Sequence, residues 1–142
     1  MRLDSRLSRV LHILLHMVRS ETPLTSEYVA NMLGTNPVVI RRTMAGLRDN
    51  GYVQSEKGHG GGWRLACDLR KVTLLDIYRA VGEPKIFSIG FDNDKPNCIV
   101  EKAVNTSLKD VLQEAEELFI RRLAEITLAD LSEEFLAQYP HK

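Results

Sequence analysis

The feature that most constrains the fold is a glycine-rich stretch, KGHGGG, at residues 57–62. It lies between two short segments, 52–56 and 62–66, in which polar and apolar residues alternate. Alternation on both sides of a glycine cluster predicts a β-hairpin with a glycine tip. Such a tip lets the backbone approach a phosphate closely. Lys57 and His59 beside Gly60 add positive charge or hydrogen-bond donors, so contact with a polyanion is predicted.

A nucleotide-binding phosphate loop is the alternative interpretation of this tip. Such a loop carries a lysine followed by serine or threonine, and it belongs to a βαβ unit. Here Gly62 is followed by Trp63-Arg64-Leu65, and no βαβ pattern surrounds the stretch. The hairpin is therefore preferred, with Trp63 as a buried strand residue.

The segment before the hairpin is typical of a tight turn followed by a cationic helix. Gly34 ends one helix, Asn36 can cap the next through its side-chain oxygen, and Pro37 suits the first helical position. The helix is predicted to end at about Asn50, before Gly51. Apolar residues at helical spacing predict its core face: Ile40, Met44 and Leu47.

The opposite face of this helix carries Val38, Arg41, Arg42, Ala45 and Arg48. In a helix-turn-helix protein the N-terminal residues of the second helix reach base edges in the major groove. An arginine there can bond a guanine bidentately, which is worth about 1–3 kcal/mol of discrimination. On the arginines alone, a solvated face without a binding role is the better interpretation. The glycine-tipped hairpin that follows reverses this preference and favours DNA binding.

Helical periodicity predicts further helices at residues 5–19, 74–81 and 98–126, and a short one after Thr127. Another helix is capped by Thr25 and ends at Gly34, and the pair Thr73 and Asp76 caps the helix at 74–81. The predicted fold class is α+β, mainly α with a small β-hairpin wing: a winged helix-turn-helix domain plus a long dimerisation helix. We expect a DNA-binding domain at 1–82, a connecting loop at 83–97, and the dimerisation and C-terminal helices at 98–142. The apolar residues of the connecting loop are expected to pack on a neighbouring surface: Ile86, Phe87, Ile89 and Phe91.

The helix predicted over 98–126 is about 40 Å long at about 1.5 Å per residue. That is longer than a winged-helix lobe can cover alone. An apolar stripe recurs along its whole length, from Val100 to Ile126. A long amphipathic helix of this kind predicts pairing with a second copy of the chain.

Charge is distributed unevenly, although the formal net charge is zero. Residues 1–66 hold nine Lys/Arg and five Asp/Glu, which gives +4, and residues 67–142 hold ten and fourteen, which gives −4. The basic half contains the cationic helix and the hairpin, as expected for a DNA-binding lobe joined to an acidic lobe. No apolar run approaches the ~20 residues of a membrane span, and no secretory cleavage site follows the first apolar run. We expect a cytoplasmic location without membrane contact.

Motifs for catalysis and metal binding are weak. Neither a nucleophile–base pair nor a paired-carboxylate motif is present, so we expect no enzyme and no catalytic residues. His12 and His16 are four residues apart, which is a metal-ligand spacing on a helix. Without an obvious third ligand, a surface or interface role is favoured and no metal site is expected. Cys67 is expected to be a small buried residue.

Taken in order, these motifs resemble the Rrf-two (Rrf2) family of bacterial winged-helix transcription regulators, the IscR/NsrR/CymR class. The resemblance is carried by LRDNGYV at 47–53, KGHGGGWRLA at 57–66, TLLDI at 73–77 and ITLADL at 126–131. It implies a homodimer, held together by the long helix, that reads a palindromic operator in double-stranded DNA.

By position, the resemblance matches four residues to places where family members contact DNA: Asn36, Val38, Arg41 and Lys57. The cluster-binding regulator has a glutamate where this chain has Arg41, so a different base preference is expected. The predicted DNA-binding set is completed by Arg42, Arg48, His59 and Gly60.

The resemblance also bears on a cofactor. Cluster-binding members carry three closely spaced cysteines before the long helix, whereas this chain has Cys98 alone there. Iron–sulfur clusters typically need four thiolate ligands, so we expect a cluster-free member without a cofactor. Cys98 follows Asn97, a natural cap, and a helix start raises thiol reactivity. Cys98 is thus a candidate sensor thiol for oxidation, nitrosylation or alkylation, and an ordinary unreactive cysteine is the alternative.

The predicted function is a sequence-specific DNA-binding transcription regulator, a homodimeric repressor that responds to a thiol-modifying or small-molecule signal. The alternative is a protein-interaction module that binds a metabolic enzyme or another partner, with DNA binding lost or secondary. Salt dependence separates the two, because phosphate contacts make DNA affinity fall steeply as salt rises. The operator, the regulated genes and the signal are left open, and an activator is the alternative to a repressor.

Overall fold

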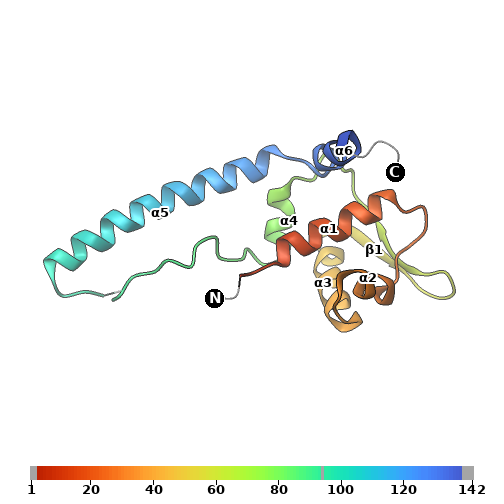
Figure 1. Cartoon of the computed structure of the whole chain (residues 1–142), viewed down its shortest axis with the longest axis horizontal. Coiled ribbons are helices and arrows are strands. Elements are labelled where there is room, and N and C mark those ends of the chain that lie inside the picture. Colours follow the sequence, from red (N-terminus) through yellow and green to blue (C-terminus); the bar gives the residue numbers. More distant parts are fainter. Residues whose placement is uncertain (1–2, 94, 139–142) are drawn as a thin grey trace.

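The computed structural model describes residues 3–93 and 95–138. In these ranges it contains α1 (Arg6–Arg19), α2 (Ser26–Leu33), α3 (Pro37–Asp49), β1 (Val53–Glu56), β2 (Gly62–Leu65), α4 (Leu74–Ala80), α5 (Ile99–Glu125) and α6 (Leu128–Gln138). The helices α1 to α4 and the hairpin gather into one body, from which α5 projects (Figure 1). The predicted α+β fold, mainly α with a hairpin wing, is confirmed.

Local capping defines the helix-turn-helix as the sequence predicts. The Thr25 hydroxyl accepts a hydrogen bond from the backbone N–H of Tyr28, and Gly34 ends α2 with φ 70°. Asn36 then caps α3 by accepting from the backbone N–H of Val39 at 3.1 Å. The turn between α2 and α3 is only three residues long, so the two helices hold a fixed relation to each other.

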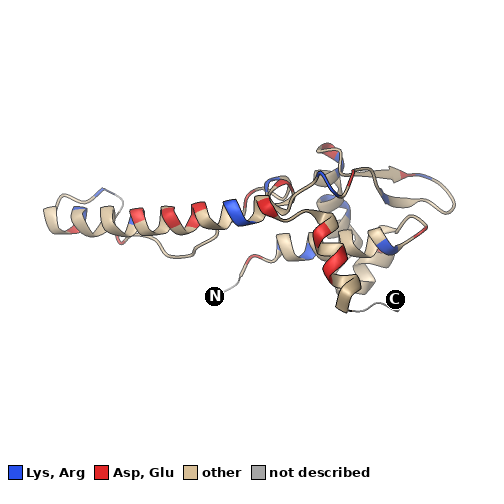
Figure 2. Ribbon diagram, turned by 90° about the horizontal axis from the view of Figure 1, so that it is seen from above, with Lys and Arg blue, Asp and Glu red and all other residues tan. Residues whose placement is uncertain are grey.

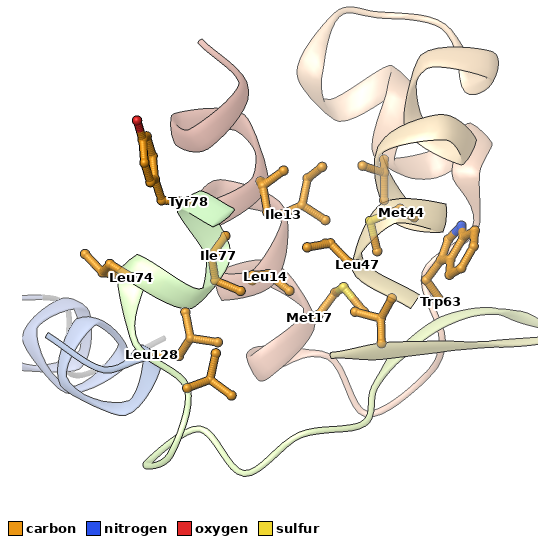
Figure 3. Close-up of a cluster of buried hydrophobic side chains, with 14 of the residues drawn as sticks. Ile13, Leu14, Met17, Met44, Leu47, Trp63, Leu74, Ile77, Tyr78 and Leu128 are labelled. Atoms are coloured by element: carbon orange, nitrogen blue, oxygen red, sulfur yellow. The ribbon is translucent and has the colours of Figure 1, made fainter. Parts of the chain in front are cut away.

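The core of the body lies where α1, α3 and α4 meet (Figure 3). The predicted core face of α3 is confirmed, because Ile40, Met44 and Leu47 are fully buried. They pack with buried residues of α1 and α4: Val10, Ile13, Leu14, Met17, Leu74, Leu75, Ile77 and Tyr78. Burial of these apolar side chains fixes the exposed face of α3 on the opposite side of the helix.

The wing is an antiparallel hairpin in which Val53 pairs with Leu65 and Glu56 with Gly62. A third segment joins it, because Leu24 and Trp63 exchange two backbone hydrogen bonds of 3.0 and 2.8 Å. Gly62 has φ 146°, and a Cβ there would lie 2.6 Å from the carbonyl oxygen of Leu24. The close approach therefore requires glycine at this position.

The chain leaves α4 as a long loop, reaches the outer end of α5 and returns along that helix to the body (Figure 1). At the return, the Leu74 N–H donates to the Ile126 carbonyl at 2.8 Å, and the Leu128 N–H donates to the Val72 carbonyl at 2.9 Å. Leu128 is 2% exposed, so α6 is docked on the same body as the helix-turn-helix. The division of the chain at residues 82 and 98 stays a prediction.

Three details differ from the sequence-based expectations. The N-cap of α5 is Cys98 rather than Asn97, because the Cys98 carbonyl already accepts the first helical hydrogen bond, from Lys102 N–H at 3.0 Å. Cys67 is half-buried rather than buried, since it lies in the loop after β2. In the connecting loop Ile86 packs against the core as expected, whereas Phe87 and Ile89 are exposed.

Candidate DNA-binding surface

The N-terminal half of α3 presents an exposed face next to the turn. Val38 is 56% exposed, and Asn36 and Arg41 are also exposed. Because the Asn36 side-chain oxygen caps α3, its amide nitrogen is the atom left to donate to a DNA phosphate. These three predicted residues share one end of the recognition helix, where base edges are reached in helix-turn-helix proteins.

Arg41 is held at this end by an ion pair with α2. Its Nη1 lies 3.3 Å from Oε1 of Glu27, and both side chains are more than half exposed. An exposed pair of this kind contributes only about 0.2–1 kcal/mol. A DNA phosphate or a guanine edge can therefore replace Glu27 at little cost, while the pair keeps the guanidinium close to the turn.

The other two arginines of α3 lie elsewhere. Arg42 lines a hollow of about 210 Å³ on the side of α1 and α4, together with Val10, Gly46 and Val81. Arg48 lies about two helical turns beyond Arg41, and its Nη2 is 3.7 Å from Oδ1 of Asp49. Of the predicted arginines, only Arg41 is thus grouped with Asn36 and Val38.

The wing tip is a tight turn closed by a hydrogen bond from Gly61 N–H to the Gly58 carbonyl at 3.0 Å. Gly58 and Gly60 have φ of 89° and 79°, a region that favours glycine. Lys57 and His59 are exposed on this turn, so both side chains can reach a phosphate. The tip extends away from the body (Figure 1), so its backbone and Lys57 are accessible to a large ligand.

One buried hydrogen bond joins the wing to α2. The Trp63 indole Nε1 donates to the Ser26 hydroxyl at 3.0 Å, and both residues are less than a tenth exposed. Trp63 is therefore a buried strand residue, as predicted, and it also links β2 to the first turn of α2. The sequence contains no local signal for Ser26, because its partner lies 37 residues away.

The long helix α5 leaves an apolar stripe uncovered. Five large side chains are between 41% and 71% exposed: Val100, Val104, Leu108, Val111 and Leu118. Acidic residues occur along the same helix (Figure 2). An exposed apolar stripe of this length is typical of a surface that contacts another protein.

The chain supplies fewer thiols than an iron–sulfur cluster typically takes as ligands. The sequence contains two cysteines, and cluster ligation typically needs four thiolates. Cys98 is exposed at the start of α5, while Cys67 is half-buried in the body, where burial raises the pKa of its thiol. Across residues 3–93 and 95–138, no three His, Cys, Asp or Glu side chains converge as metal ligands.

In the same ranges, none of the helices is both long enough and apolar enough to cross a lipid bilayer.

A helix-turn-helix with an exposed recognition helix, followed by a glycine-tipped wing, defines the class of winged-helix DNA-binding proteins. The family model described as "Rrf2: Iron-dependent Transcriptional regulator" matches residues 3–134. The chain therefore belongs to the Rrf2 family, and it is a DNA-binding transcription regulator, which confirms the family predicted from the motifs.

Two relatives in Bacillus subtilis (strain 168) bear the names of HTH-type transcriptional regulators. YwnA is 30% identical over 129 residues, covering 91% of this chain and 96% of YwnA. NsrR is 32% identical over 81 residues, covering 57% of this chain and 54% of NsrR. These relatives are transcription regulators by name and not enzymes.

Two solved structures share the fold. IscR from T. potens is 22% identical, covers 98% of this chain and 91% of its own, and has a TM-score of 0.68. CymR (YrzC), named the global cysteine regulator of B. subtilis, is 20% identical, covers 94% of this chain and 98% of its own, and has a TM-score of 0.60. At these identities the comparison supports the architecture alone.

Proposed function

We propose that this regulator is a homodimeric repressor that reads a palindromic operator. Val38 and Arg41 enter the major groove, while the Asn36 amide and Lys57 with the wing-tip backbone contact phosphates. The observation that carries this proposal is the exposed N-terminal end of α3, next to α2, to which the buried Trp63–Ser26 hydrogen bond joins the wing. A base-reading end and a phosphate-contacting tip on one rigid unit suit a DNA half-site.

The homodimer is supported by the uncovered apolar stripe of α5. A second copy packed against this stripe would remove Val104, Leu108 and Val111 from water, which is favourable at roughly 25 cal/mol per Å² of buried apolar surface. Two-fold symmetry would then present two recognition helices to two half-sites, and operator palindromy mirrors that symmetry. The role also implies a cytoplasmic location.

For the signal, we propose that Cys98 responds to thiol modification and that no cofactor is bound. Cys98 is exposed and stands at the N-cap of α5, so its modification changes charge or size at the start of the proposed dimerisation helix. Such a change can shift the dimer between DNA-competent and incompetent forms. The alternative is that the signal is a small ligand.

The DNA proposal is tested by fluorescence anisotropy with the DNA upstream of the gene, over a series of salt concentrations. Arg41→Ala should relax base choice at one position of each half-site, by about 1–3 kcal/mol for a lost bidentate contact. Lys57→Ala should weaken cognate and random DNA alike and lower the salt slope by about 1. Equal losses on both DNAs for Arg41→Ala would contradict its base-reading role.

The dimer is tested with Val111→Asp, which places a charge in the middle of the α5 stripe. Because Val111 is 63% exposed in the single chain, the variant should keep its helix content but become a monomer in light scattering. Gln113→Asp, on an exposed position of the same helix, is the matched control and should stay dimeric. If the Val111→Asp variant stayed dimeric, the α5 stripe would not be the dimer interface.

The signal is tested by measuring operator binding with reduced and mildly oxidised protein, and again with Cys98→Ser. Oxidation should change the affinity of the natural protein and leave Cys98→Ser unaffected. An unchanged response in the variant contradicts the thiol proposal. Absence of specific, salt-dependent DNA binding in either state would favour the protein-interaction module instead.

A further inference from the structure

Two histidines of α1 bring their ring nitrogens together on the surface. Nε2 of His12 and Nε2 of His16 are 3.1 Å apart, and the ring centroids are 4.9 Å apart. Both side chains are exposed and line a hollow of about 160 Å³ between α1 and α6. The remaining lining residues are Leu15, Arg19 and Phe135. The DNA-binding surface described above uses neither histidine.

The separation of the two nitrogens suits a single metal ion. Imidazole nitrogens bind Zn²⁺ at about 2.0–2.1 Å, and at that distance from both Nε2 atoms the nitrogen–metal–nitrogen angle is about 100°. This value lies between the angles of octahedral and tetrahedral coordination. A hydrogen bond between the two rings, one donating and one accepting, is the metal-free arrangement with the same geometry.

The surroundings keep the rings available as ligands. The Arg19 guanidinium, which opposes a bound cation, is turned onto the Phe135 ring, with its carbon 4.7 Å from the ring centroid. It therefore does not stand between the two nitrogens.

We propose that His12 and His16 form a two-imidazole site for a divalent late transition-metal ion of the Ni²⁺, Cu²⁺ and Zn²⁺ type. Nitrogen ligands select these ions over Mg²⁺ and Ca²⁺, which prefer oxygen. Because the described part of the chain supplies no third side-chain ligand, water completes the coordination shell and the site is open. Binding links successive turns of α1 beside its contact with α6 and raises the thermal stability of the protein.

The test is titration of the tag-free, reduced, full-length protein with Ni²⁺, followed by calorimetry and by the metal's visible absorbance. We expect saturable binding of one Ni²⁺ per chain and an increase in Tm. His12→Ala and His16→Ala should each lose both effects. His59→Ala, which removes an exposed imidazole from the wing, and Cys98→Ser, which removes the exposed thiol, are the matched controls and should retain both.

Circular dichroism without metal checks that each variant is folded, and His12→Gln and His16→Gln replace any alanine variant that is not. Absence of saturable Ni²⁺ binding by the natural protein would overturn the proposal. Equal binding by the His12 and His16 variants would do the same. The outcome is independent of operator binding, because neither histidine belongs to the proposed DNA-binding surface.

Discussion

The buried hydrogen bond between Trp63 and Ser26 can be measured with a double-mutant cycle. Trp63→Phe removes the indole donor, and Ser26→Ala removes the hydroxyl acceptor of the 3.0 Å bond. Each single change leaves one buried polar group without its partner, which costs about 1–3 kcal/mol of unfolding free energy. Trp63→Phe loses further packing because phenylalanine is smaller and Trp63 is 8% exposed.

The double variant should lose less unfolding free energy than the two single variants lose in sum, because neither buried polar group then lacks its partner. We expect a coupling free energy of about 0.5–3 kcal/mol, as for residues in direct contact. Urea unfolding followed by circular dichroism measures it, at one protein concentration because the proposed dimerisation would contribute to stability. Additive effects within about 0.3–0.5 kcal/mol would refute the reasoning.

Loss of this hydrogen bond should also affect DNA binding, because the bond joins the wing to α2. Ser26→Ala leaves the two backbone hydrogen bonds between Leu24 and Trp63 in place, so the hairpin remains attached. The wing should nevertheless be held less rigidly, and operator affinity should fall with a smaller salt slope. An unchanged slope would mean that the backbone pairing alone positions the wing.

Three further outcomes follow from individual contacts. A Cβ on Gly61 would lie 2.2 Å from a backbone oxygen of β1. Gly61→Ala should therefore distort the wing and reduce DNA affinity, measured by anisotropy, without unfolding the body. Unchanged affinity would contradict this. Glu27→Gln releases Arg41 from its ion pair and removes a negative charge near DNA. Affinity for any DNA, measured in the same way, should therefore rise by up to about 1 kcal/mol. A fall in affinity would show that the ion pair orients Arg41 for DNA binding. In timed iodoacetamide labelling read by mass spectrometry, exposed Cys98 should react first. Half-buried Cys67, whose pKa is raised by burial, should react slowly and speed up only at higher pH, and equal rates at neutral pH would contradict its burial.

Short-range signals in the sequence were sufficient to predict the helices and the position of the recognition helix. Thr25, Asn36 and Thr73 cap their helices through partners only three residues ahead. The apolar spacing of Ile40, Met44 and Leu47 assigns the core face of α3, and thereby the exposed face that carries Arg41. These features depend on neighbours within one helical turn, so they can be inferred without the fold.

The tertiary structure decided how these elements are joined. Trp63 meets Ser26 across 37 residues and Arg41 meets Glu27 across 14, and neither pair has a local pattern. The packing of α3 against α1 and α4 decides that Arg42 lines a hollow beside those helices. The histidine pair shows both levels: spacing places the two rings on one side of α1, whereas the fold brings Phe135 of α6 into the hollow that they line. Side-chain partners distant in sequence are selected by the shape of the whole core, which no short stretch of sequence contains.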